Sequence, residues 1–230
     1  MKKTKMNFIN KERVYMKKFS LTLLGLFLAS LLIMPFKVYA IKNDNLGDIK
    51  ESNKICALKF NEKRLWIDHV LWTRSFIVSD LASLPDKDVV LQRLLKNQDD
   101  IGNSIKPYYG EEAGNKLSKL LREHIEIGGQ VIDAAKTNNK ANLDKYNKLW
   151  YGNADEIANF LAAANPNWSE SELKNMLHKH LGFVTTQVVA RLNNDWKADV
   201  AAFDKGEEHM IMFADILANG IIKQFPDKFK

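Results

Sequence analysis

The chain has 230 residues, a formal net charge of +6 and a single cysteine, which excludes an intrachain disulfide. Its length allows one domain, or two small ones, with a full apolar core. Residues 1–40 hold eight of the 34 basic residues and one of the 28 acidic residues. The rest of the chain therefore carries 26 basic and 27 acidic residues and is nearly neutral. This balance gives no electrostatic reason to expect nucleic-acid binding.

The first part of the chain has the pattern of an export signal. Two lysines precede the apolar run at 19–34, and Val38-Tyr39-Ala40 supplies the small residues of a cleavage site. We expect a signal peptide at 1–40, in which 1–15 is an upstream extension if translation starts at Met16. An uncleaved anchor is the alternative, because the run just reaches the length of a short span. The protein is therefore predicted to be secreted or at the cell surface, with no stable membrane span after cleavage and an anchor only if cleavage fails.

A linker and one helical domain are predicted to follow. Residues 41–60 are polar and lack a regular apolar period, so we expect a linker in which Cys56 is a free thiol or, alternatively, forms a dimer through a disulfide. Within 61–225, apolar residues recur every three or four positions, which predicts an all-α fold, an antiparallel helical bundle of about six helices. The expected helices are 61–84, 87–105, 111–136, 141–164, 169–204 and 207–224.

Local signals set the boundaries of these helices. Pro107-Tyr108-Tyr109-Gly110 breaks the second from the third, and Thr137-Asn138-Asn139-Lys140 forms a turn. Ser169-Glu170-Ser171-Glu172 fits a capping box at the start of the fifth helix. No comparable break is recognised before Gly206, so the fifth helix is expected to continue to Asp204.

Polar residues interrupt the apolar stripes of several of these helices. His69, His124, His180 and His209 each lie on the apolar stripe of a different part of the chain. On the long fifth segment, Asp195 lies in a row with Arg191 and Asp199, at a spacing of four residues. Histidines and carboxylates that project inward from several helices form the metal sites of bundle proteins. Imidazole suits Zn, Cu or Fe. The four histidines and Asp195 are the predicted ligands of a transition metal.

A purely structural interpretation stays open beside the metal site. Each histidine would then be a neutral core residue bonded to a neighbour, and Arg191 would form an internal ion pair with Asp195 or Asp199. No Glu-x-x-His pair occurs on one helix face, as a di-iron bundle requires. The sequence also lacks a nucleophile elbow, a phosphate loop and a dinucleotide fingerprint, so no catalytic residue and no organic cofactor are predicted.

Four segments resemble a family of small exported bacterial helical proteins without an established activity, over nearly the whole mature chain. Members are labelled glycosyltransferase or acetylglutamate kinase. Both activities normally rest on an α/β nucleotide-binding domain, whose strands and glycine-rich loops are not found in this sequence. The resemblance therefore implies the helical fold and export, and it carries over no catalytic residue. The segments are Leu65–Arg74, Gln98–Gly110, Trp150–Ala158 and His209–Asp215.

These observations together predict an exported helical-bundle binding or structural protein with a core-facing layer of His, Asp and Arg, and with a bound metal ion as its candidate ligand. The alternative is a non-catalytic interaction protein in which the buried polar residues only fix the register of the helices. Its partner would be the cell wall or another protein. An exported enzyme of unrecognised type is the third alternative.

Overall fold

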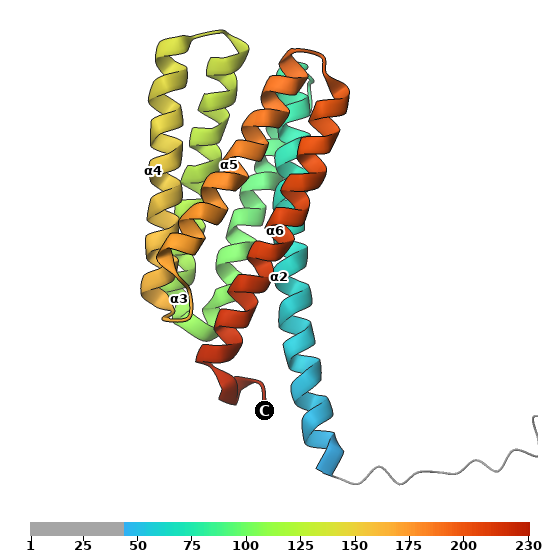
Figure 1. Ribbon diagram of the computed structural model, residues 1–230, viewed down its shortest axis with the longest axis vertical. Coiled ribbons are helices and arrows are strands. Elements are labelled where there is room, and N and C mark those ends of the chain that lie inside the picture. The colour runs from blue at the N-terminus through green and yellow to red at the C-terminus, as the bar shows by residue number, and fades with distance from the viewer. Residues whose placement is uncertain (1–43) are drawn as a thin grey trace, which may run out of the picture. The chain divides into compact units, whose positions relative to one another are not determined.

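A computed structural model describes residues 44–230 of the chain. The predicted signal peptide and its cleavage site lie outside these residues. Residues 44–230 contain helices and no strand, so the all-α prediction is confirmed (Figure 1). No helix in this part has an apolar run of the length that a bilayer requires. The elements are α2 (Asp44–Leu81), α3 (Lys87–Lys136), α4 (Lys140–Ala164), α5 (Glu170–Leu192), α6 (Trp196–Gln224) and the short 3₁₀ turn η1 (Pro226–Lys228).

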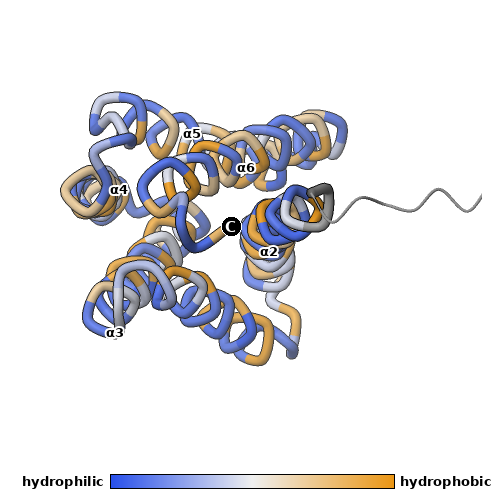
Figure 2. The backbone as a smooth tube through the Cα atoms, turned by 90° about the horizontal axis from the view of Figure 1, so that it is seen from below, coloured by the Kyte–Doolittle hydropathy of each residue, from blue (hydrophilic) through white to orange (hydrophobic). Residues whose placement is uncertain are grey.

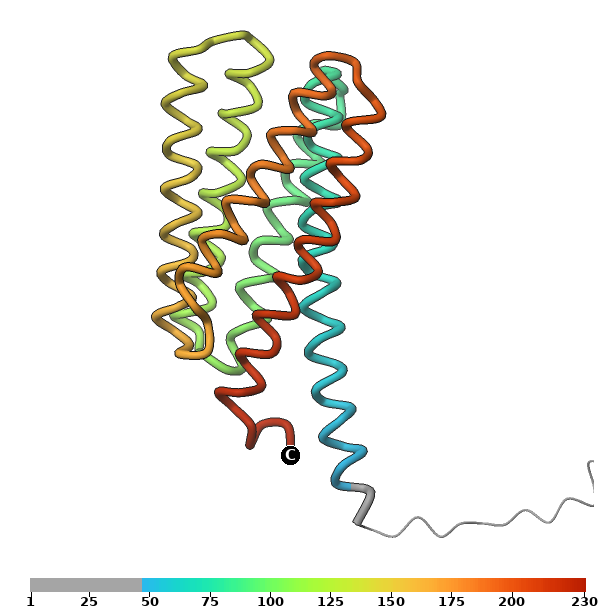
Figure 3. Tube along the Cα trace, in the orientation of Figure 1, coloured from blue at the N-terminus to red at the C-terminus, as the bar shows by residue number. Residues whose placement is uncertain are grey.

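Helix α3 is a hairpin of two limbs. Gly110 has φ 85° and ψ 172°, which is not helical, and the chain reverses there (Figures 1 and 3). The predicted break at Pro107–Gly110 falls on this reversal. The first limb covers 87–109 and the second limb 111–136, and Arg122 Nη1 of the second donates to Asp99 Oδ2 of the first at 3.0 Å. The prediction of about six helices thus counted these limbs separately, whereas residues 44–230 contain five α-helices.

The two limbs of α3 approach each other most closely at two glycines. A Cβ built on Gly102 would lie 2.5 Å from the carbonyl oxygen of Gly114 and 2.9 Å from the backbone nitrogen of Ser118. Both distances are shorter than real Cβ contacts, and the neighbouring atoms are backbone. Only glycine fits there, so the close packing of the hairpin depends on it.

The helices surround a common interior. Helix α3 packs on α2 and α4, α5 packs on α4 and α6, and α6 packs back on α2. Figure 2 shows this arrangement end-on. Apolar side chains fill the interior, for example Trp66 and Phe213, whose rings meet edge to face with centroids 5.0 Å apart. This packing fits the helical bundle predicted from the period of the apolar residues.

The long helix predicted for 169–204 is wrong, because the chain turns between α5 and α6. Asn194 has φ 58°, a left-handed conformation that asparagine tolerates better than most residues. The side chain of Asp195 then accepts a hydrogen bond from the backbone N–H of Ala198 at 3.0 Å and caps α6. Two polar residues with strong local preferences therefore end one helix and start the next.

Other local signals have mixed outcomes. The capping interaction predicted for α5 is confirmed, since Ser169 Oγ accepts from the backbone N–H of Glu172 at 3.4 Å. Gly206, expected to separate two helices, lies inside α6 instead. A Cβ there would lie 3.4 Å from Cβ of Phe183 on α5. Gly206 therefore lies at the contact between α5 and α6 and does not end a helix.

The predicted linker at 41–60 is helical from Asp44 onward. Most side chains of its first turns are exposed, and this end of α2 extends along the bundle axis beyond the other helices (Figure 1). Lys54 Nζ donates to the carbonyl oxygen of Lys228 at 3.3 Å, and Cys56 is an exposed free thiol. An apolar period reports burial against a core, so an exposed helix leaves no such signal in the sequence.

One buried carboxylate ties three helices together. Asp199 of α6 is 1% exposed and accepts from Arg74 of α2 at 2.8 and 2.9 Å and from Arg191 of α5 at 2.8 Å. A buried charge is stable only with such partners. The predicted internal ion pair between Arg191 and Asp199 is confirmed, but it joins two helices and does not run along one.

Candidate functional site

Two histidines meet at the centre of the bundle. His69 of α2 and His180 of α5 are 2% and 3% exposed, and their Nε2 atoms lie 3.4 Å apart. The two ring centroids are 5.3 Å apart. Both residues lie on apolar stripes, so the packing that buries each stripe also brings the two imidazoles together. Two of the five predicted ligands therefore form a direct pair.

His124 lies next to this pair. It belongs to the second limb of α3, and its ring centroid is 6.4 Å from that of His180. His124 Nδ1 lies 2.7 Å from Asn153 Oδ1, while Asn153 Nδ2 donates to the carbonyl oxygen of Leu120 at 3.2 Å. Since the amide nitrogen of Asn153 is used as a donor, its oxygen must accept, and His124 Nδ1 carries the proton. The Nε2 atom of neutral His124 then has a free lone pair.

Gln98 lies beside His69. Gln98 Nε2 donates to the carbonyl oxygen of Leu94 at 2.8 Å and to Asn97 Oδ1 at 3.1 Å. Gln98 Oε1 and His69 Nδ1 are both buried, and neither atom has a hydrogen-bond partner. Gln98 acts to raise the pKa of His69, against the larger effect of burial.

All three histidines of this cluster are neutral at physiological pH. Burial lowers the pKa of His69 to about 3 and that of His124 to about 4. Burial also lowers the pKa of His180 well below its usual value, and the neighbouring histidines act in the same direction. Desolvation penalises the charged form of an imidazole, so the cluster presents uncharged nitrogen donors.

The remaining predicted ligands lie elsewhere. His209 is buried on α6, and its Nε2 donates to the carbonyl oxygen of Met176 at 2.7 Å, which satisfies that nitrogen. Asp195 is exposed at the start of α6, where it caps the helix. His180 lies about 18 Å from the end of α5 at 1.5 Å per residue, so Asp195 is far from the histidine pair. The structure brings together His69, His124 and His180.

Glu62 was not recognised from the sequence. It lies on α2, one helical turn before Trp66 and two turns before His69, and its side chain is 1% exposed. Burial raises its pKa to about 7, opposed by hydrogen bonding to Ser104 and Trp66. Its spacing of four and seven residues from Trp66 and His69 placed it on the same stripe, and that signal could have identified it.

The arrangement of these donors limits what they can bind. Within residues 44–230, no three His, Cys, Asp or Glu side chains are grouped so that together they could hold a metal ion. The cluster instead offers one close pair of nitrogens, His69 Nε2 and His180 Nε2, with a third histidine beside it. The donors available to an ion are therefore two neutral imidazoles in an apolar interior.

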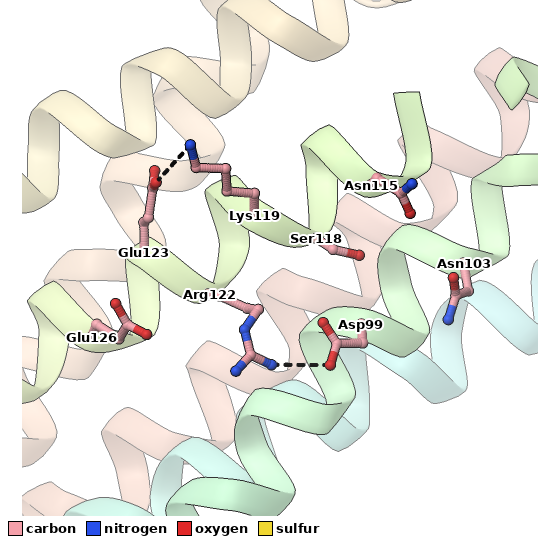
Figure 4. Close-up of a pocket in the computed structure, with 8 residues that line it drawn as sticks. All are labelled: Asp99, Asn103, Asn115, Ser118, Lys119, Arg122, Glu123 and Glu126. Atoms are coloured by element: carbon pink, nitrogen blue, oxygen red, sulfur yellow. Dashed lines mark hydrogen bonds and ion pairs between the residues drawn. The ribbon is translucent and has the colours of Figure 1, made fainter. Parts of the chain in front are cut away.

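The surface of the hairpin carries a separate polar pocket. Its side chains come from both limbs of α3 (Figure 4). Arg122 pairs with Asp99 at 3.0 Å and Lys119 with Glu123 at 3.8 Å, so most of the charge in the pocket is neutralised. The lining residues are Asp99, Asn103, Asn115, Ser118, Lys119, Arg122, Glu123 and Glu126.

No protein-family model, curated protein or solved structure matches this chain. The resemblance to exported helical proteins thus stays a prediction. The buried histidine cluster itself is the basis for assigning a function.

Proposed function

We propose that this protein is an exported helical bundle that binds one transition-metal ion between His69 and His180. The distance between their Nε2 atoms, 3.4 Å, supports this proposal. Two nitrogens at about 2.1 Å from one tetrahedral ion lie roughly 3.4 Å from each other. The observed distance between the two Nε2 atoms is also longer than an ordinary hydrogen bond from a nitrogen donor, which is about 2.9–3.0 Å.

One hydrogen bond beside the pair is of the kind found around metal sites. Histidines that bind metals usually donate their second ring nitrogen to a carbonyl or carboxylate, which fixes the tautomer. His124, next to the pair, donates Nδ1–H to the amide oxygen of Asn153 in this way and keeps the lone pair of its Nε2. The Nδ1 atoms of His69 and His180 are buried without a hydrogen-bond partner. The proposed role is to hold an ion outside the cytoplasm, with export inferred from the leader at residues 1–40.

Substitution of His180 tests the proposal directly. The purified chain is expected to bind one metal equivalent, and His180→Gln should weaken binding at least about 100-fold, because a ligand is lost while a polar side chain of similar size remains. His178→Gln is the matched control on the same helix. His178 pairs with Asp155 at the surface, 2.8 Å away, and its loss should leave binding unchanged. Elemental analysis and competition with a chelator give the stoichiometry and the affinity.

Loss of binding in both variants, or in neither, would contradict the assignment to the buried pair. Absence of metal after reloading would favour the alternative function, in which His180 Nε2–H donates weakly to His69 Nε2. The protein would then be a non-catalytic interaction module whose polar core only sets the register of the helices.

The dependence of binding on pH separates a buried site from a surface site. Surface histidines with a pKa near 6.5 lose roughly tenfold in affinity each between pH 7.5 and 5.5, because protons compete for the ligand nitrogen. Burial lowers the pKa of His69 to about 3 and that of His180 well below its usual value. We expect less than about a twofold change in affinity over this range. A drop of about 100-fold would place the ion on surface histidines instead.

A further inference from the structure

We infer that α2 pairs with α2 of a second copy of this chain, in antiparallel orientation, through an apolar stripe on its outer face. The outer stripe consists of Ile49, Cys56, Phe60, Ile67 and Leu71. It does not include the buried histidines, so the inference is independent of the proposed function. The exposure of the outer stripe, the spacing of its residues and its length carry the inference.

The outer stripe is apolar although it faces away from the bundle. Phe60 is 72% exposed, Ile49 48% and Leu71 42%. Cys56 is exposed as well. The opposite face of α2 packs on α3 and α6, and in the end-on view no described helix lies on the outer side of α2 (Figure 2). A helix that is apolar on two sides is expected to bury both, so the outer stripe lacks a partner.

The spacing of the outer stripe is that of a surface which packs along another helix. Ile49, Phe60 and Leu71 follow one another at intervals of 11 residues, and so do Cys56 and Ile67. Eleven residues are about three helical turns, so all five side chains stay on one side of the helix over its length. Only three of the five precede residue 61, so the repeat emerges only over the whole of α2.

The order of the intervals fits a second copy of the same helix. From Ile49 through Cys56 and Phe60 to Ile67, the intervals are 7, 4 and 7 residues, which read the same in both directions. A two-fold axis at residue 58 therefore places Ile49 of each copy opposite Ile67 of the other, and Cys56 opposite Phe60. Each of these apolar side chains then meets another apolar side chain.

The antiparallel orientation also gives the protruding end of α2 a partner. This end extends beyond the other helices (Figure 1), and Leu58 is the first side chain of α2 that the structure describes as buried. With the two-fold axis at residue 58, the protruding end of each copy lies beside the part of α2 that belongs to the bundle of the other copy. The two bundles then lie on opposite sides of residue 58 and do not compete for the same space. Opposed helix dipoles favour this orientation as well.

The length of the outer stripe sets the strength of the pair. Residues 49–71 span about 33 Å and a helix is about 10–12 Å wide, so the contact covers roughly 400 Å² on each copy. The total of about 800 Å² is smaller than the 1,200–2,000 Å² of a stable interface. We therefore expect a reversible dimer with a dissociation constant on the order of 10–100 µM.

Sedimentation equilibrium of the purified chain under reducing conditions tests the pairing. Phe60→Lys should raise the dissociation constant of the dimer at least about 30-fold, because it places a charge near the centre of the contact. Val89→Lys is the matched control, since Val89 is 73% exposed but lies on α3. This variant should dimerise like the original chain.

Thiol cross-linking tests the orientation. Cys56 is the single cysteine of the chain, and in the antiparallel pair the two copies of it lie about 6 Å apart along the helix axes. A short bis-maleimide should therefore join two copies, and Phe60→Lys should prevent this. In the Cys56→Ser background, Ile49→Cys should not cross-link to itself, because the two copies of residue 49 would lie about 27 Å apart along the axes.

Three outcomes would overturn the inference. Cross-linking of Ile49→Cys to itself would exclude the antiparallel orientation. A chain that stays monomeric at millimolar concentration, or a dimer that Phe60→Lys leaves intact, would exclude pairing through the outer stripe. A monomer that binds lipid vesicles and loses this binding in Phe60→Lys would assign the stripe to a membrane surface instead.

Discussion

Alanine at position 102 is expected to lower the free energy of unfolding by about 3 kcal/mol, the upper end of the usual cost of overpacking. The added Cβ would lie 2.5 Å from the carbonyl oxygen of Gly114 and closer still to Ser118 Oγ. The serine side chain can rotate away, but the carbonyl belongs to the backbone of the opposite limb of α3. The limbs must therefore separate, which loosens the packing between them. Urea denaturation followed by circular dichroism measures the loss.

Gly182→Ala is the matched control for this substitution. Gly182 lies inside α5, and a Cβ there meets no atom within 4 Å. Alanine is a better helix former than glycine by about 0.8–1.0 kcal/mol, so this variant should be slightly more stable than the original chain. Equal stabilities for the two alanine variants would contradict the close approach of the two limbs.

Acidification of the metal-free Glu62→Gln variant is expected to remove at least about 4 kcal/mol of folding free energy between pH 7.5 and 5.0. Burial lowers the pKa of His69 to about 3 and that of His124 to about 4, from 6.5 for a free histidine. A pKa that is lower in the folded than in the unfolded state contributes stability above pH 6.5. This contribution is lost as the pH falls toward the pKa of the folded state. Each of the two histidines contributes about 2 kcal/mol, and His180 acts in the same direction.

Glu62 opposes this trend in the original chain. Burial raises its pKa from 4.5 to about 7, so its contribution is fully present below pH 4.5 and is lost as the pH rises through 7. The original chain should therefore lose about 2 kcal/mol less than the variant over the same range. Denaturant unfolding at both pH values measures the difference. Adding His124→Gln to Glu62→Gln should reduce the loss by about 2 kcal/mol, and an unchanged loss would show that His124 does not contribute.

Most helices of this protein could be predicted because their signals are local. The break at Gly110 and the cap at Ser169 act within a few residues, so the sequence alone located them. The turn at 193–195 was missed although it resembles the recognised turn at 137–140. Asn138 and Asn194 both have positive φ, 51° and 58°. The second turn lies between stretches whose apolar residues keep a helical period across it, and that period hid the signal.

The start of α2 could not be predicted for a different reason. An exposed helix buries no stripe, so its apolar residues need no period. The same limit explains Gly206, which was expected to break a helix. It lies against Phe183 of α5 inside a continuous helix, and that neighbour is set by packing between helices. Local sequence carries no record of such a contact.

The sequence by itself determined that His69, His124 and His180 face the core, because position on an apolar stripe is a property of one helix. It did not determine which of the five predicted ligands meet. That depends on the relative heights of helices far apart in the chain, and only the tertiary structure decided it. The bundle places the Nε2 atoms of His69 and His180 at 3.4 Å and leaves Asp195 at a helix end. Metal-site geometry is therefore a property of the packed bundle, since a shift of one helical turn, about 5.4 Å, would separate the pair.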